Sequence, residues 1–164
     1  MVKMGYLIRK MRKENTVNVQ DVAKKSWNAT YEGIIPSAIQ ENFLKSAYSD
    51  KMMEKRLNGS LFLVAETENN IVGFANYSPI NNKGEAELGA IYIYPEYQGK
   101  GLGSLLLQEG IRNLEGVKGI FINVEKENKI GKTFYEAKGF NVVEEFDDDF
   151  DGHILKTVRM VLEV

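Results

Sequence analysis

The chain has 164 residues, 43% hydrophobic and 27% charged, with 21 Lys and Arg against 23 Asp and Glu and a net charge of -2. This predicts one globular domain, residues 1–164, in the cytoplasm, with no reason to expect nucleic acid or a membrane as a partner. The absence of cysteine excludes a disulfide scaffold, a thiolate zinc site and a cysteine nucleophile, and no apolar run is long enough to span a membrane.

The first part of the chain predicts one short strand followed by helices. We expect the strand near residues 6–9, and apolar residues on one helical face predict a helix over about 19–28. Two further helices are expected over residues 37–47 and, behind an N-cap at Ser49, over 50–57.

From Leu61 onward the pattern is typical of strands. Compact apolar runs at 61–65 and 71–75 flank a polar turn, which predicts a hairpin. The elements expected after it are a strand over about 85–94, a helix from Gly101, a strand at 120–124, a helix closed by Gly139, and strands at 142–146 and 157–162. This order indicates a mixed α/β protein whose first strands are antiparallel.

Residues 91–104 carry the strongest chemical signal, because a strand there leads through a glycine-rich loop into a helix. Glycines allow the backbone to approach a ligand closely. The N–H groups of the first helical turn and the helix dipole favour an anion. The loop therefore predicts a pyrophosphate site, with a plain turn as the alternative.

Two other nucleotide-binding motifs fit this chain less well. A Rossmann fingerprint needs a third Gly or Ala where the chain has Ser104, and its loop leaves the strand without the intervening residues 95–98. Glu125 ends the next strand about where a ribose-binding acid would lie, so a dinucleotide-dependent oxidoreductase stays an alternative. Residues 131–133 are similar to the end of a P-loop, but Lys126 replaces its first glycine and excludes that motif.

Two blocks of the sequence resemble the GNAT (Gcn5-related N-acetyltransferase) superfamily. The segment QGKGLG at 98–103 matches the family's Q/R-x-x-G-x-G/A signature, and Asn128, Tyr135 and residues 139–140 match its N-x(6)-Y-x(3)-G-F element. The order of expected elements is similar over nearly the whole chain. A third block, from Trp27 to Ile34, is similar to a subgroup that includes bacterial polyamine and small-amine acetyltransferases.

The resemblance implies the GNAT fold, a central mixed, mostly antiparallel sheet of about seven strands flanked by helices and splayed between the fourth and fifth strands. It also implies acetyl-CoA (coenzyme A) as cofactor, no metal, and acetyl transfer to a primary amine, with a polyamine or other small amine as the leading acceptor. Acetylation of a protein N-terminus or lysine and a non-catalytic CoA-binding module are the alternatives. Homodimers are common in the family, so a second copy of the chain is a candidate partner beside the small-molecule amine.

The resemblance also assigns cofactor-binding roles to matching positions. The backbone of residues 91–93 would bind the pantetheine arm, and a bulge near Gly89 and Ala90 would splay the strand. The loop would hold the pyrophosphate, and Asn128 would contact the cofactor from the next helix. The expected cofactor-binding residues are Ile91, Tyr92, Ile93, Gln98, Gly99, Lys100, Gly101, Leu102, Gly103, Ser104 and Asn128.

Catalysis needs an acid and a base, because an alkylamine with a pKa of about 10.4 is mostly charged at neutral pH. Tyr135 matches the family's general acid, which protonates the CoA sulfur. Glu87, four residues before Ile91, is the candidate base, and a water relay is the alternative. Some relatives place a glutamate five residues before Asn128, but this chain has Asn123 there, which cannot accept a proton.

The acceptor side is marked by aromatic and acidic residues. Trp27 and Tyr31 share one helical face and are candidate substrate-binding residues, with a core role as the alternative. The acidic run 144–151 is expected either as a solvated hairpin loop or as a wall that attracts a cationic acceptor. His153, the only histidine, is expected in a polar loop.

Overall fold

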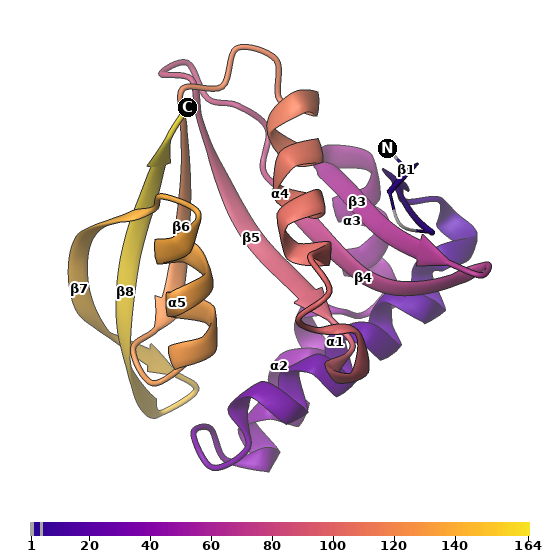
Figure 1. Ribbon diagram of the computed structural model, residues 1–164. Coiled ribbons are helices and arrows are strands. Elements are labelled where there is room, and N and C mark those ends of the chain that lie inside the picture. The colour runs from indigo at the N-terminus through magenta and orange to yellow at the C-terminus, as the bar shows by residue number, and fades with distance from the viewer. Residues whose placement is uncertain (1, 4) are drawn as a thin grey trace.

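The computed structural model describes residues 2–3 and 5–164, which form one sheet with helices on both faces (Figure 1). The strand order is β1-β2-β3-β4-β5-β6-β8-β7. The strands are β1 (Val2–Lys3), β2 (Tyr6–Lys10), β3 (Leu61–Thr67), β4 (Asn70–Tyr77), β5 (Glu85–Ile93), β6 (Gly119–Glu125), β7 (Asn141–Phe150) and β8 (His153–Glu163). The expected sheet of about seven strands is confirmed, with the two-residue β1 added at one edge. In the described part of the chain, no helix is long and apolar enough to cross a membrane.

In the described part of the chain, five α-helices cover the two faces of the sheet. They are α1 (Thr16–Tyr31), α2 (Ser37–Ala47), α3 (Asp50–Gly59), α4 (Leu102–Asn113) and α5 (Lys129–Ala137). Alternate residues of β3 show how the faces divide: Leu63 and Ala65 join the core under α4, whereas Phe62 and Val64 join the core under α1 and α3. Strands buried on both faces explain why residues 61–65 form a continuous apolar run.

The expected helices are present, with differences at their ends. The bounds of α2 agree with the prediction, and the Oγ of Ser49 caps α3 by accepting a hydrogen bond from the Met52 N–H at 3.2 Å. Helix α1 is longer than expected, because it begins at Thr16 and continues to Tyr31. Its extra C-terminal turn carries Tyr31, which lines the cavity described below.

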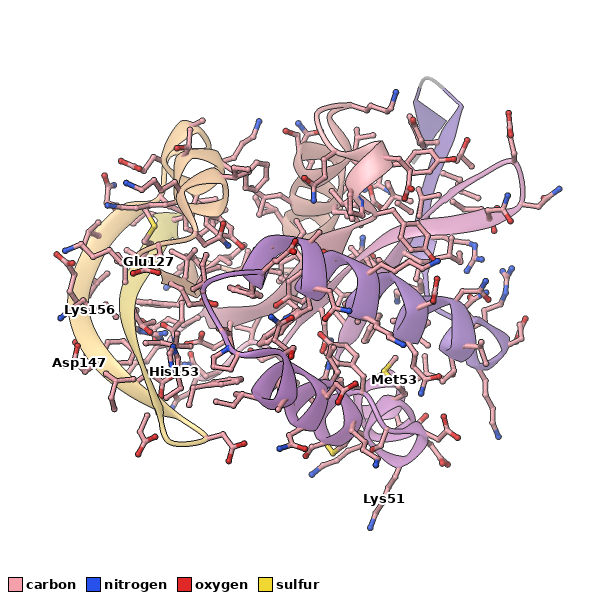
Figure 2. The ribbon with its side chains drawn as sticks, turned by 90° about the horizontal axis from the view of Figure 1, so that it is seen from below. Lys51, Met53, Glu127, Asp147, His153 and Lys156 are labelled. Carbon is pink, nitrogen blue, oxygen red and sulfur yellow. The ribbon has the colours of Figure 1, made fainter. Side chains whose placement is uncertain are left out.

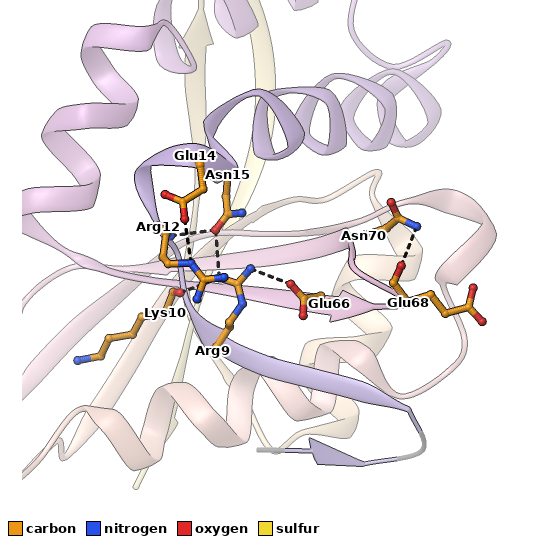
Figure 3. A network of polar contacts seen from close by, with 8 residues as sticks. All are labelled: Arg9, Lys10, Arg12, Glu14, Asn15, Glu66, Glu68 and Asn70. Carbon is orange, nitrogen blue, oxygen red and sulfur yellow. Dashed lines mark hydrogen bonds and ion pairs between the residues drawn. The ribbon is translucent and has the colours of Figure 1, made fainter.

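A network around Arg9 anchors the start of α1 (Figure 3). The guanidinium donates to Glu66 Oε1 on β3 at 2.9 Å and to Asn15 Oδ1 at 3.0 Å. Asn15, at the start of α1, also accepts a hydrogen bond from the Arg12 N–H at 2.9 Å. Because one cation joins two strands to the helix start, α1 has a fixed position relative to the sheet.

The acidic run is a strand, so its expectation as a hairpin loop is wrong. Strand β7 continues through Phe150, and only Asp151 and Gly152, both with positive φ, form the turn before β8. Opposite charges support the pairing: Asp147 lies opposite Lys156 and forms an ion pair with it at 3.6 Å. Phe146 and Phe150, four residues apart on one face of the strand, are partly buried, and Asp148 lies between them on that face.

The sheet is splayed between β5 and β6, the fourth and fifth strands of the expected seven. Parallel pairing joins residues 85–87 to 119–121 and then stops, although both strands continue, and Figure 1 shows them diverging. The expected bulge near Gly89 and Ala90 is confirmed. Asn76 pairs with Ala90 and Tyr77 with Leu88, which leaves Gly89 as the extra residue.

The bulge also exchanges the two faces of β5. Ala86 and Leu88, before it, lie in the core under α4, whereas Ala90, after it, lies in the core under α1. The antiparallel strands around a single parallel pair do not form the parallel sheet of a dinucleotide-binding domain, so that alternative is not supported by the fold.

Candidate active site

A cavity of about 880 Å³ opens where β5 and β6 diverge. Its walls are residues 88–93 of β5, the loop that enters α4, the end of β6 with α5, and the C-terminal end of α1. The cavity therefore passes between the two faces of the sheet and is lined by helices that lie on opposite sides.

Most of the expected cofactor-binding residues line this cavity. Lys100 is the exception, since it is exposed in the loop and does not form part of the wall. The residues brought together are Ile91, Tyr92, Ile93, Gln98, Gly99, Gly101, Leu102, Gly103, Ser104 and Asn128.

The loop before α4 has the geometry of an anion site. Gly99 and Gly101 have φ of 77° and 82°, and a Cβ added to either would meet no atom within 4 Å. Both glycines are therefore required by the left-handed backbone conformation, and the space beside them is open. Gly101 is the N-cap of the twelve-residue α4, and no side chain caps that end. The N–H groups of the first turn of α4 have no intrahelical partner, which suits an anion such as the expected pyrophosphate.

Asn128 begins α5 at the opposite wall. Its Oδ1 accepts a hydrogen bond from the Gly131 N–H at 3.0 Å, so the side-chain oxygen is the N-cap of the helix. This capping role fixes Asn128 beside the cavity and leaves its amide NH₂ as the group with free donors.

Tyr135 of α5 lines the cavity from the face that α4 and α5 cover. Its ring makes edge-on contacts with Phe134 and Phe140, with centroid distances of 5.4 and 5.3 Å. Burial, and then the negative charge of Glu125, raises the pKa of Tyr135 above its usual range. The phenol therefore keeps its proton at neutral pH, which the predicted role of general acid requires.

Glu87 is not brought to the cavity. It lies before the bulge, opposite Phe121 where the strand pairing ends, and its carboxylate forms an ion pair with Arg159 of β8. The same guanidinium donates to Asn123 Oδ1 at 3.0 Å and lies over the Phe121 ring. The Arg159 guanidinium thus binds both the carboxylate of Glu87, which is the expected base, and the side-chain amide of Asn123.

Trp27 and Tyr31 take different positions, although both belong to the same helix face. Tyr31 lines the cavity. Trp27 is 3% exposed and is not part of the cavity wall. Its Nε1–H donates to the Tyr92 hydroxyl at 2.8 Å, and its ring stacks on Phe43 with a centroid distance of 4.3 Å. Trp27 therefore supports the cavity wall from behind.

The β7–β8 hairpin rests on the loop between α1 and α2 and closes this end of the site. Phe150 contacts the rings of Trp27 and Phe43, and His153 Nε2 lies 3.1 Å from the carbonyl oxygen of Ile34. Figure 2 shows His153 facing that loop. The expectation of a loop histidine is wrong, because His153 is the half-buried first residue of β8.

Glu125, at the end of β6, is a site residue for which the sequence suggests only a ribose contact. It is half-buried and lines the cavity beside Tyr31. Burial raises the pKa of Glu125 and the negative charge of Asp148 adds to the rise, whereas the Tyr31 hydroxyl opposes it. The available signal was the two-residue period of a strand, which places Glu125 on the same face as Asn123.

Known acetyltransferases are similar to this chain in sequence and structure. The model of the acetyltransferase (GNAT) family matches residues 22–140. A spermidine N(1)-acetyltransferase of Thermoplasma acidophilum is 32% identical over 155 residues, which cover 90% of this chain and 95% of that protein. An uncharacterized N-acetyltransferase of Bacillus subtilis, YuaI, is 30% identical over 158 residues, which cover 92% and 90% of the two chains.

A solved structure shares the fold along its whole length. The crystal structure of the PaiA N-acetyltransferase from Thermoplasma acidophilum, in complex with coenzyme A, superposes with a TM-score of 0.85. The two chains are 28% identical, and the match covers 98% of this chain and 100% of the other.

Proposed function

Because this chain belongs to the acetyltransferase (GNAT) family, whose cofactor is acetyl-CoA, we propose that it acetylates a primary amine of a small polycation, with a polyamine such as spermidine as the leading acceptor. The observation that carries this proposal is the cavity between β5 and β6, with an anion-binding loop at one end and a carboxylate at the other. Cytoplasmic location and a homodimer stay predictions.

The charge of the acceptor end supports a polycation. Glu125 lies inside the cavity, and Asp148 of β7 is close enough to influence its ionisation. Asp148 pairs with Leu155 of β8, which is buried in the cluster with Trp27 and Tyr31, so its side chain lies on the α1 face of the sheet. Two carboxylates on that face suit an acceptor that carries a second ammonium group.

The acidic run 144–151 therefore contributes fewer residues to the acceptor end of the cavity than its length suggests. Asp147 and Lys156 form their ion pair on the opposite face, at the outer side of the hairpin (Figure 2). Asp149 accepts a hydrogen bond from the Gly152 N–H at 2.8 Å within the turn. We propose Asp148 as the member of the run that acts on the acceptor.

The residues of the chain have separate tasks in this reaction. Acetyl-CoA, when bound, supplies an acetyl group activated as a thioester. The backbone of 91–93 would hold its pantetheine arm, and the loop from Gln98 to Ser104 with Asn128 would hold the rest. Tyr135 keeps a proton at its phenolic oxygen, on the α5 side of the gap. Holding both reactants in one narrow cavity supplies much of the rate increase.

The test is thiol release from acetyl-CoA across spermidine, spermine, amino acids, aminoglycosides and short peptides, with coenzyme A binding measured by calorimetry. We expect tight coenzyme A binding and turnover with polyamines in preference to the other acceptors. Turnover restricted to peptides would replace the polyamine with a protein acceptor. Binding without any turnover would leave a non-catalytic coenzyme A module.

A further inference from the structure

We propose that Glu125 is the catalytic base that removes the proton from the acceptor ammonium, and that Tyr31 positions its carboxylate. The inference rests on the proposed function, since it names the proton acceptor of the same site. It assigns the base to a residue of β6 that lies inside the cavity, in place of Glu87, which does not line it.

The strand geometry places Glu125 on the acceptor face of the sheet. Ile122 and Val124 of β6 lie in the core under α4 and α5, so Asn123 and Glu125 face the other side. Glu125 pairs with Thr157 of β8, which agrees with this face. Helix α1, which carries Tyr31, covers the same face.

Glu125 also lies at the open part of the splay. Parallel pairing ends at Glu87 and Phe121, and counting on along both strands, with the bulged residue of β5 included, brings Glu125 level with Tyr92. Burial raises the pKa of Tyr92 most, and the charges of Tyr48 and then Glu125 add to the rise, so Tyr92 and Glu125 lie close together. The base therefore stands across the gap from the strand that is expected to hold the thioester.

The groups around Glu125 leave its carboxylate available to an ammonium. Tyr31 of α1 and Asp148 of β7 influence the ionisation of Glu125. The charge of Glu125 in turn adds to the effect of burial in raising the pKa of Tyr92 of β5 and of Tyr135 of α5. Among the described residues, no lysine or arginine forms an ion pair with Glu125, in contrast to Glu87 with Arg159. Burial and Asp148 raise the pKa of Glu125 towards neutrality, where a carboxylate is a better base.

The two proton-transfer groups occupy opposite sides of the gap, with Glu125 on the α1 side and Tyr135 on the α5 side. Glu125 takes one proton from the ammonium and releases it to solvent. The amine nitrogen then bonds to the acetyl carbon as the carbon–sulfur bond breaks. Tyr135 protonates the leaving sulfur and regains the second proton that the nitrogen loses as the amide forms, so one proton is released per turnover.

The test compares wild type with Glu125→Gln, and uses Glu115→Gln, an exposed residue after α4, as the matched control. We expect kcat/KM for spermidine at pH 7 to fall about 10²–10⁴-fold in Glu125→Gln and to be unchanged in the control. The loss should shrink as the pH rises towards 10, because free amine then needs no base. It should also shrink for trifluoroethylamine, a weakly basic amine that is already neutral at pH 7.

A second measurement does not depend on turnover. Because burial raises the pKa of Glu125, the folded protein holds more protons there than the unfolded chain, and this stability is lost as the pH rises. Glu125→Gln should therefore melt at a higher temperature than wild type at pH 8, with the difference vanishing near pH 4. Unchanged coenzyme A binding would confirm that the variant is folded.

Three results overturn the inference. Glu125→Gln could turn over at the wild-type rate, it could lose activity equally at every pH and with both amines, or Glu87→Gln could show the pH-dependent loss in its place. If wild type acetylates no amine although it binds coenzyme A, the proposed function has failed, and the melting difference still reports whether Glu125 is the desolvated carboxyl.

Discussion

Arg159 forms its ion pair with Glu87 at the closed end of the splay, where the pairing of β5 and β6 ends. The pair joins β5 to β8 across β6, and the guanidinium also donates to Asn123 and covers the Phe121 ring. Both positions at which the family pattern suggests a base are therefore bound to one arginine. The splay therefore has the Glu87–Arg159 ion pair at its closed end and the carboxylate of Glu125 at its open end.

The Glu87–Arg159 pair should contribute little to stability, because it is partly exposed, with side-chain exposures of 48% and 26%. We expect Glu87→Gln to lower the free energy of unfolding by at most about 1 kcal/mol. Urea denaturation measures this change, and it should shrink at high salt. A loss of several kcal/mol would mean that the pair behaves as a buried one.

Replacing Tyr135 by Phe removes the proposed acid and keeps the packing of the ring between Phe134 and Phe140. We expect kcat to fall about 10²–10⁴-fold, with coenzyme A affinity and melting temperature close to wild type. Stopped-flow thiol release and calorimetry measure the two effects. An unchanged kcat would show that water or another group protonates the sulfur.

Asp148 should set the pH at which activity appears. Its negative charge raises the pKa of Glu125, so Asp148→Asn lowers that pKa and keeps the carboxylate ionised to lower pH. We expect the acidic limb of kcat/KM to move to lower pH in this variant. Asp147→Asn is the matched control, because Asp147 pairs with Lys156 on the other face. Equal shifts in both variants would point to the general charge of the hairpin.

The glycine-rich loop offers a test of its backbone conformation. Gly101 has φ of 82° and open space beside its Cβ position, so Gly101→Ala costs only the left-handed conformation, about 1–2 kcal/mol of unfolding free energy. We also expect weaker coenzyme A binding, because the first turn of α4 moves. Gly59→Ala in α3, where φ is ordinary and space is also open, should cost nothing. Equal effects of the two substitutions would remove the conformational argument.

The site was predictable to the extent that its residues are close together in sequence. The loop 98–104 and the neighbouring strand carry their own signals, and the structure places them on one cavity wall. Trp27 and Tyr31 were not separable by spacing, since both lie on one helical face and only packing decides which ring lines the cavity. The sequence predicts a loop for the acidic run because its many charges obscure the strand pattern, of which Phe146 and Phe150 are the only apolar residues between 144 and 151.

Local periodicity and glycine placement predict the order of strands and helices and the glycine-rich entry to α4. The bulge near Gly89 is implied only by the family resemblance. Which carboxylate lines the cavity depends on how distant parts of the chain pack together. The sequence alone predicts Glu87 as the base. In the folded chain Arg159 of β8 pairs with Glu87, whereas Tyr31 of α1 lies beside Glu125 in the cavity wall. Those partners are distant in the chain, so the ionisation of each glutamate depends on contacts that no local pattern records.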